Sequence, residues 1–334
     1  MSRPRLPFPE PFLERLQAIV PAGRLPAVLE SFTHRRPTTF RGNPLKRDDR
    51  ALEEELAMAG FRLDPVPWLP GAWRIPPSQR RALTESTACL EGRLYIQGLS
   101  SMLAPILLAP RPGEQVLDLA AAPGGKTLQM AAMMANRGRL SAVEPVRSRF
   151  FRLRANLERH GATMVKAYRM DGRAVGSKVP ERFDRVLLDA PCSSEARFRA
   201  QRPESWAYWS LRKIRECAHK QRRLLESGLR ALRPGGTLLY CTCSFAPEEN
   251  EAVVDAALAR HPGELEVEPL GLELEDLQPG LDHWQGRAFD PALAAAVRVL
   301  PGADREGLFL CRLRRRSVPG HSVSPSSPSR KTTR

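Results

Sequence analysis

Two cysteines and an aspartate follow apolar runs that are expected to form neighbouring strands. Asp189 ends the run FDRVLLD, Cys192 comes three residues later, and Cys243 follows the run GTLLYCT. The carboxyl ends of neighbouring parallel strands meet at one edge of a sheet, so these three side chains are predicted to lie close together. Each alone also has an ordinary interpretation, because strand-end carboxylates cap helices and free cysteines pack as small apolar residues.

The three residues together would suit chemistry on a cytosine ring. A thiolate that adds to carbon 6 turns carbon 5 into a nucleophile, which can take a methyl group from a sulfonium donor. The reaction also needs an acid or hydrogen-bond partner at nitrogen 3 and a base that removes the carbon 5 proton. Cys243 fits the thiolate, Asp189 fits the partner of nitrogen 3, and a group near Cys192 fits the base.

A turn rich in small residues follows the first strand of this region, in the stretch VLDLAAAPGGKT, residues 116–127. Its end resembles a phosphate-binding loop, but Ala120 stands where that pattern requires glycine, and Gly124 and Gly125 alone cannot make a dinucleotide motif. A strand–turn–helix of small residues still lets a ligand approach the backbone and presents helix N–H groups to an anionic part of it. A carboxylate would serve as well as a phosphate, and a plain strand–helix turn is the alternative.

Two further acidic residues stand at predicted strand ends. Glu144 follows the strand near 139–143, roughly 20 residues after the glycine turn, where an acidic side chain can accept from two ribose hydroxyls. Asp171 follows the strand near 164–169. With strands also at 115–120, 183–189, 236–242 and 307–313, strands and helices alternate, which predicts a mostly parallel sheet covered on both faces.

The composition bounds the class of protein and its partners. The 334 residues carry a net charge of +15, which favours a nucleic-acid partner over a merely solvated basic surface. No apolar run reaches the ~20 residues of a membrane span, and the N-terminus does not resemble a secretory signal. The six cysteines form no C-x-x-C pair, so we expect neither disulfides nor a metal site, and a cytoplasmic location.

Three regions are expected along the chain. Residues 1–95 combine helical segments with the extended, basic stretch RRPTTFRGNPLKRDD, and predict a small α/β accessory domain. Residues 96–316 form the predicted α/β domain, in which 210–232 is a helix with one apolar stripe. The tail, 317–334, is basic, of low complexity and expected to be disordered.

Four stretches are similar to the RNA 5-methylcytosine methyltransferases of the RsmB/RsmF/NSUN (Nop/Sun) family. They are LYIQGLSSMLAPILL, PGEQVLDLAAAPGGKT, VLLDAPCSS and LRPGGTLLYCTCSFAPEENE, and the resemblance covers about residues 30–315. It implies a Rossmann-like class I methyltransferase sheet and S-adenosylmethionine as methyl donor. The residues that it places on the donor are Ala120, Ala121, Ala122, Pro123, Gly124, Gly125, Lys126, Glu144 on the ribose, Asp171 near the adenine, and Asp189.

The resemblance also assigns the two thiols and the RNA-binding region. It makes Cys243 the nucleophile and Cys192 the residue that assists product release, while Asp189 faces both the donor and the target base. The segment RPTTFRGNPLK is similar to the family's N-terminal RNA-binding region. The residues expected to contact RNA are Arg35, Arg36, Arg41 and Lys46.

The sequence departs from the family pattern in a few places. Ala120 and Cys241 replace a common cysteine and a frequent serine, and SSEARF differs from the usual continuation after P-C-S. Because the chain ends near the end of the catalytic sheet, we expect no further C-terminal RNA-binding domain. The expected substrate is ribosomal RNA first and transfer RNA second, acted on by a monomer. The alternatives are a DNA cytosine methyltransferase that uses Cys192, and a non-catalytic RNA-binding or ribosome-assembly protein.

Overall fold

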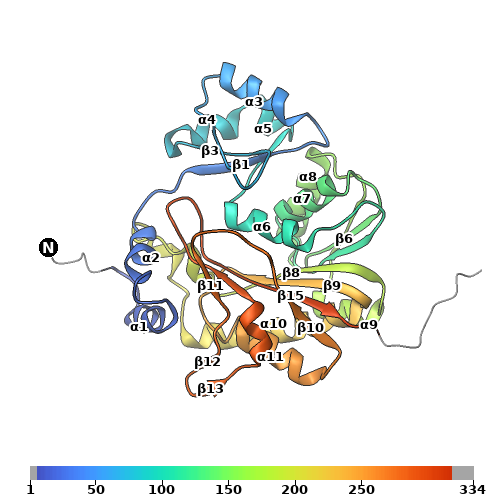
Figure 1. Ribbon diagram of the computed structural model, residues 1–334. Helices are drawn as coiled ribbons and strands as arrows, with labels where there is room; N and C mark the ends of the chain where they lie inside the picture. Colours follow the sequence, from blue (N-terminus) through green and yellow to red (C-terminus); the bar gives the residue numbers. More distant parts are fainter. Residues whose placement is uncertain (1–5, 318–334) are drawn as a thin grey trace, which may run out of the picture.

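The computed structural model describes residues 6–317, and its centre is a nine-stranded sheet (Figure 1). Five neighbouring strands run parallel, and each strand pair beyond β9 is antiparallel. The spatial order is β11 (Leu277–Pro279), β14 (Val297–Val299), β15 (Leu308–Arg315), β9 (Leu232–Thr242), β8 (Phe183–Asp189), β5 (Gln115–Asp118), β6 (Arg139–Val143) and β7 (Val165–Tyr168), with β10 (Leu265–Glu268) paired to β15. The predicted Rossmann-like sheet is confirmed, as is the adjacency of β8 and β9.

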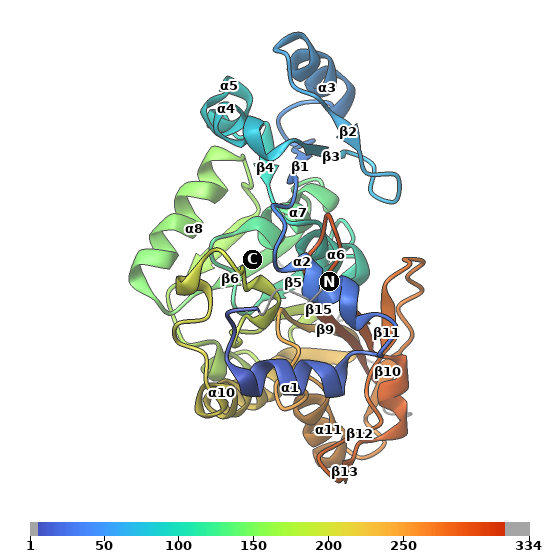
Figure 2. The same ribbon diagram turned by 90° about the vertical axis from the view of Figure 1, so that its left-hand side faces the viewer.

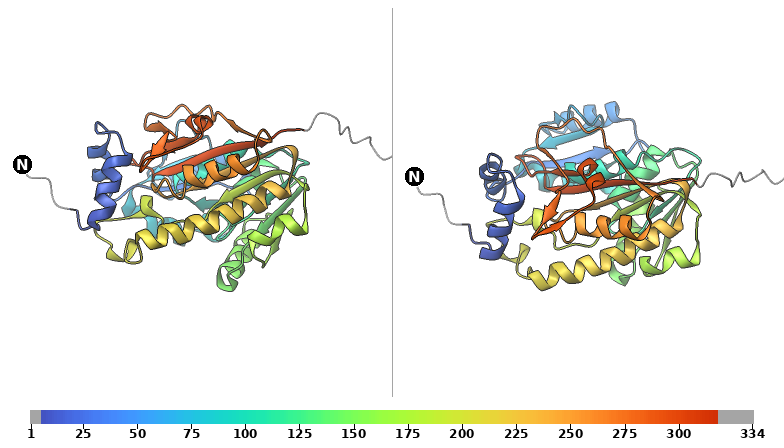
Figure 3. Two further views of the ribbon diagram at one scale, coloured as in Figure 1. Left: turned by 90° about the horizontal axis from the view of Figure 1, so that it is seen from below. Right: turned by 60° about the horizontal axis from the view of Figure 1, so that its bottom comes forward.

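Helices cover both faces of this sheet because successive strand residues point to opposite sides. Val116 packs into the core under α6, α7 and α8, whereas Leu117 packs into the core under α10 and α11. Figure 3 shows α10 running along one face of the sheet. The bounds are α6 (Leu99–Leu108), α7 (Gly125–Met133), α8 (Arg147–Arg159), α9 (Val175–Lys178), α10 (Leu211–Ala231) and α11 (Glu251–Arg260).

A small α/β unit lies beside the glycine turn, at the top of Figure 1. Its antiparallel sheet has the order β2-β3-β1-β4, and its core includes Phe40 stacked on Trp73. The bounds are β1 (Thr38–Gly42), α3 (Asp49–Met58), β2 (Asp64–Pro65), β3 (Ala72–Ile75), α4 (Arg80–Glu85), α5 (Thr87–Leu90) and β4 (Leu94–Ile96). The extended basic stretch of the sequence therefore supplies β1, one of the two inner strands.

The first two helices, α1 (Glu10–Ile19) and α2 (Leu25–Ser31), lie against the large sheet rather than against the small one (Figure 2). Phe12 of α1 packs against Phe198 with ring centroids 4.9 Å apart, and Arg15 forms an ion pair with Glu248. The small domain as a packed unit therefore comprises residues 38–96, and the predicted bounds 1–95 and 96–316 stay a prediction.

Short elements complete the part of the chain that the structure describes. Within residues 6–317, no helix is both long and apolar enough to span a bilayer. The predicted disordered tail lies outside the described residues, apart from Ser317. The remaining elements are η1 (Pro77–Gln79), η2 (Gly172–Ala174), η3 (Glu195–Arg197), η4 (Pro203–Ser205), η5 (Pro291–Ala295), β12 (His283–Trp284) and β13 (Arg287–Ala288).

Candidate active site

A cavity of about 630 Å³ opens at the carboxyl ends of β5, β8 and β9. The turn after β5 forms one wall, and the loops after β8 and β9 bring Asp189, Cys192 and Cys243 to another. The predicted meeting of these three side chains is therefore confirmed in position. Open α/β sheets bind their ligands at this edge, so the cavity is the candidate active site.

The two thiols lie against each other. Cys192 Sγ and Cys243 Sγ are 3.4 Å apart, and the Cys243 side chain is buried. The hydrogen bond from Cys192, together with the positive charge of Arg197, outweighs burial and lowers the pKa of Cys243 to about 7. The same hydrogen bond, together with burial, raises the pKa of Cys192 well above its usual value. The two shifts therefore favour Cys243 over Cys192 as the thiol that carries the negative charge.

Arg197 is a functional candidate that the sequence analysis missed. It lies in η3, inside the SSEARF departure, and it lines the cavity together with Cys192 and Cys243. The negative charge of Cys243 is the largest cause of the raised pKa of Arg197, and Glu306 holds the guanidinium at 3.7 Å. The sequence did contain a signal for this role, because Arg197 follows shortly after Cys192 and a cation beside a thiol favours the thiolate.

This arrangement predicts the pH dependence of thiol reactivity. Because the thiolate fraction grows as pH rises through the pKa, alkylation of Cys243 by iodoacetamide should reach half its maximal rate near pH 7. In Arg197→Ala the curve of alkylation rate against pH should shift to higher pH. In Arg197→Lys, which keeps the positive charge, the curve should stay close to that of the parent protein. Mass spectrometry of the peptide that contains Cys243 measures the rate. A curve that does not move in Arg197→Ala would remove Arg197 from this role.

Asp189 is ion-paired with the lysine of the glycine turn. Lys126 Nζ donates to Asp189 Oδ2 at 2.6 Å and to Ser101 Oγ at 2.8 Å. Burial opposes the charge on Asp189, but Lys126 outweighs it, so the pKa of Asp189 is lowered. Cys241 donates to the other oxygen at 3.6 Å, and burial raises its pKa well above the usual value. In the free protein Asp189 is therefore an ionised hydrogen-bond acceptor.

The glycine turn is packed closely against its neighbours and lines the cavity. Gly124 has φ +114°, and a Cβ at Gly125 would lie 2.8 Å from the Tyr95 ring. No side chain caps the N-terminus of α7, whose first residues Gly125 and Lys126 line the cavity, and its first N–H groups have no intrahelical partner. Arg41 closes the turn from the small domain, because its Nη2 donates to the Gly125 carbonyl at 3.0 Å.

Asp118 offers a buried acceptor at the same place. One carboxylate oxygen accepts from Thr127 Oγ1 at 2.7 Å, and within residues 6–317 the other has no hydrogen-bond partner. Burial raises the pKa of Asp118 to about 6. Asp118 lines the cavity, so its carboxylate lies where an ammonium or hydroxyl group of a ligand could approach. The turn and Asp118 together fit a ligand that has both cationic and polar parts.

Glu144 and Asp171 lie at strand ends as predicted, but neither lines the cavity. The buried Glu144 accepts from the Val146 N–H at 2.8 Å, with Arg149 at 3.5 Å. Asp171 forms an ion pair with Arg173, which lowers the pKa of Asp171. Their predicted roles on ribose and adenine stay predictions.

The residues predicted to contact RNA fall into different environments. Arg35 is exposed and Arg36 half-buried, and both line a second cavity of about 680 Å³. Lys46 is exposed on the small domain. Arg41 corrects the expectation: it is 6% exposed, because its guanidinium turns inward to Gln97 and to the Gly125 carbonyl. It joins the small domain to the glycine turn instead of facing solvent.

The second cavity adjoins the first and is strongly basic. The two share Ile96, Gln97, Gly98 and Glu306 as lining residues. Its arginines come from the segment before β1, from α4 of the small domain, from the loop before α10 and from the loop before β15, so it runs between the two domains. They are Arg35, Arg36, Arg80, Arg199, Arg202 and Arg305.

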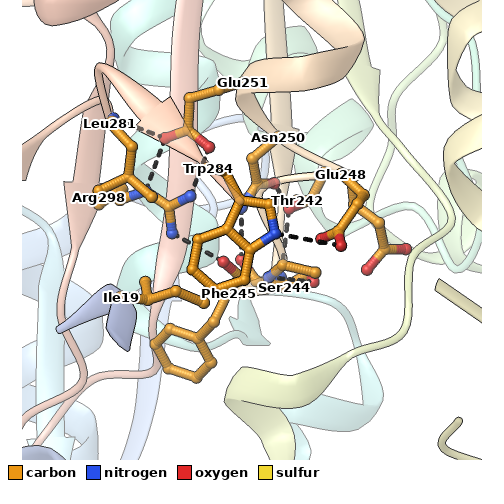
Figure 4. Close-up of polar contacts among 12 residues, drawn as sticks. Ile19, Thr242, Ser244, Phe245, Glu248, Asn250, Glu251, Leu281, Trp284 and Arg298 are labelled. Atoms are coloured by element: carbon orange, nitrogen blue, oxygen red, sulfur yellow. Dashed lines mark hydrogen bonds and ion pairs between the residues drawn. The ribbon is translucent and has the colours of Figure 1, made fainter. Parts of the chain in front are cut away.

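A buried polar network holds the loop that carries Cys243 (Figure 4). Arg298 Nε donates to Glu251 Oε1 at 2.7 Å, and Arg298 Nη1 donates to the Phe245 carbonyl at 2.9 Å. Asn250 Nδ2 donates to the Ser244 carbonyl at 2.9 Å. These contacts fix the backbone immediately after Cys243.

No group of three or more metal-ligating side chains gathers among residues 6–317.

The sheet order, the glycine turn and the strand-end site are those of the Rossmann-like methyltransferases. The chain belongs to the 16S rRNA methyltransferase RsmB/F family, whose model matches residues 105–314. Residues 8–98 match the N-terminal domain of 16S rRNA methyltransferase RsmF. The predicted family resemblance is confirmed.

Similar proteins include two named ribosomal RNA small subunit methyltransferase F. That of Cronobacter sakazakii is 39% identical over 319 residues, which cover 92% of this chain. That of Escherichia coli O127:H6 is 38% identical over 323 residues, which cover 94% of this chain. The matches span 63% and 65% of the lengths of these two relatives.

Solved structures share the fold. A methyltransferase homolog protein from Pyrococcus horikoshii is 33% identical with a TM-score of 0.80, covering 93% of this chain and 96% of that one. NSun6 from the same organism, solved with SFG, is 22% identical with a TM-score of 0.77, covering 92% and 98%. The second likeness concerns the fold alone.

Proposed function

We propose that this protein is an S-adenosylmethionine-dependent RNA (cytosine-5)-methyltransferase that acts on ribosomal RNA. The observation that carries the proposal is the pair of thiols 3.4 Å apart, in a cavity whose other wall is the glycine turn. The lowered pKa of Cys243 supports its role as nucleophile. The names of the RsmF relatives support ribosomal over transfer RNA.

The donor would be held by the glycine turn, with Asp118 as acceptor for its ammonium group and the uncapped N-terminus of α7 near its carboxylate. S-adenosylmethionine supplies an electrophilic methyl group on a sulfonium. Lys126 is committed to Asp189, so it neutralises the carboxylate between the turn and the thiols. The lysine of the Gly-Lys-Thr end thus forms an ion pair with Asp189, and its predicted contact with the donor stays a prediction.

The reaction of the base follows from the thiol geometry. The target cytosine leaves its stack to reach the buried Cys243, as base-modifying enzymes require. Cys243 adds to carbon 6, and the ionised Asp189 accepts a hydrogen bond from the exocyclic amino group or from a protonated nitrogen 3. After methylation, a base beside Cys192 takes the proton of carbon 5, the Cys243 thiolate leaves carbon 6, and the ring is restored. Cys192 is placed to assist because it touches the sulfur that must leave.

Transfer of a labelled methyl group tests the activity. Purified protein should incorporate label from S-adenosylmethionine into small-subunit ribosomal RNA, and bisulfite sequencing should place the product at carbon 5 of a cytosine. A strain that lacks the protein should lose the same site and regain it on complementation. Label in DNA alone, or no incorporation in spite of donor binding, would contradict the proposal.

The basic cavity is the proposed path of the RNA strand. We expect Arg35→Ala/Arg202→Ala to weaken RNA binding, because both side chains are exposed in that cavity. The slope of log affinity against log salt should flatten by ~0.7–0.9 for each lost phosphate contact. The control is Arg152→Ala/Arg154→Ala, two exposed arginines on α8 outside both cavities. Equal slopes in the two double variants would rule out this path.

A further inference from the structure

Two buried carboxylates, Glu195 and Glu249, lie beside the thiols without a part in the reaction described above. Glu249 is 0% exposed and accepts from the Ser193 N–H at 2.9 Å, from Ser193 Oγ and from Gln221 Nε2 at 3.2 Å. Ser193 directly follows Cys192. Glu249, which belongs to the segment after Cys243, therefore holds the loop of the other cysteine.

Glu195 makes the opposite connection. It is 2% exposed, and one of its oxygens accepts from the N–H groups of Phe245 at 2.8 Å and Ala246 at 2.9 Å, and from Ser244 Oγ at 3.1 Å. Its other oxygen accepts from Trp209 Nε1 at 2.8 Å. Glu195, which belongs to the loop of Cys192, therefore holds the backbone after Cys243.

The loop after β8 and the loop after β9 therefore each contribute one carboxylate that holds the other loop. We propose that Glu195 and Glu249 are positioning residues that together fix the short separation of Cys192 and Cys243. Each loop is held by a carboxylate from the other loop, so loss of either contact lets one thiol move relative to the other. The consequence for catalysis rests on the proposed function, but the consequence for thiol spacing does not.

The hydrogen-bond chemistry separates the two residues. All four partners of Glu195 are donors, so a glutamine amide would place its NH₂ against Trp209 or against the backbone N–H groups. Glu249 differs, because Ser193 Oγ can accept from a glutamine NH₂ while it donates to Ser244 Oγ, 3.0 Å away. The carbonyl oxygen of that glutamine would keep the contacts with the Ser193 N–H and with Gln221. Glu249→Gln is therefore expected to preserve the geometry that Glu195→Gln breaks.

The spacing can be measured with phenylarsine oxide, a probe that needs two adjacent thiols. Its arsenic binds both sulfurs, and its oxygen leaves as water with the two thiol protons. In the intact free protein, one arsenical should bridge Cys192 and Cys243 and protect both from alkylation. In Glu195→Gln and Glu249→Ala the affinity for the probe should fall roughly tenfold or more. A buried donor that loses its acceptor disfavours the arrangement in which the two thiols are adjacent by about that factor.

Controls make the result specific to these contacts. Cys192→Ala must abolish bridging, and Glu226→Ala must not change it, because Glu226 pairs with Arg230 and His261 away from the cavity. Thermal unfolding shows whether each variant is folded. If Glu195→Gln does not fold, Glu195→Gln/Trp209→Phe removes the opposing donor and should recover both folding and bridging.

Three results would overturn the proposal: unchanged bridging in Glu195→Gln and Glu249→Ala, loss of bridging in Glu249→Gln equal to that in Glu249→Ala, or no recovery in Glu195→Gln/Trp209→Phe. None of these measurements uses RNA or methyl transfer. A protein that fails to methylate RNA could therefore still show this pattern, and the two proposals can fail separately.

Discussion

Cys192→Ala is expected to trap the protein on its RNA, and Cys243→Ala to abolish both methylation and any covalent complex. Cys243 has the lowered pKa and is the proposed nucleophile at carbon 6. Cys192 has a raised pKa and touches the Cys243 sulfur at 3.4 Å. Its loss should still permit attack, with a smaller thiolate fraction at Cys243 because a hydrogen bond is lost, and should slow the release of the base. Substrate RNA and S-adenosylmethionine are incubated with each variant and resolved on a denaturing gel.

The expected pattern is a slow-migrating adduct with Cys192→Ala that is absent from Cys243→Ala and from the double variant. Cys217→Ala is the matched control, because this buried thiol lies on α10 outside the cavity and should behave as the parent does. An adduct in Cys243→Ala alone would make Cys192 the nucleophile and support the DNA-type mechanism. Full activity without an adduct in both variants would exclude the cysteine mechanism.

The sequence predicted the sheet well because its strands are continuous apolar runs between turn residues. The predicted 183–189 coincides with β8, and 139–143 with β6. The predicted 115–120 is two residues too long, because the chain leaves β5 at Asp118 to begin the glycine turn. The meeting of Cys192 and Cys243 followed from the rule that parallel strands align their carboxyl ends.

The sequence did not predict the contacts between loops or between the two domains. Arg41 lies in a basic stretch, and only the docking of β1 beside the glycine turn shows that its guanidinium is buried. Nothing in the sequence indicated that Lys126 pairs with Asp189, which is 63 residues away. Glu195 begins the single turn η3 and Glu249 lies in an irregular segment, so no periodicity indicates which backbone each one holds. Arg197 was visible as an arginine, but its approach to Cys243 depends on the turn η3.

The second large effect concerns stability, and it arises from the buried pair of Glu251 and Arg298. The exposed fractions of the two side chains are 0% and 4%. Glu251 also accepts from the Leu281 N–H at 3.0 Å, and Arg298 donates to the Phe245 carbonyl. The pair thus joins α11, β14 and the loop after Cys243 (Figure 4). Little water can solvate either charge if its partner is removed.

Glu251→Ala is therefore expected to lower the free energy of unfolding by about 3–5 kcal/mol, the usual cost of leaving one buried charge without its partner. Glu251→Leu/Arg298→Met should recover most of this loss, because it removes both charges and keeps apolar volume. The control is Glu54→Ala, which breaks the exposed Arg50–Glu54 pair on α3 and should cost at most ~1 kcal/mol. Urea unfolding measures all three variants. If Glu251→Ala costs no more than Glu54→Ala, the pair does not anchor this loop, and the position of Cys243 must depend on the contacts of Asn250 and Glu195 instead.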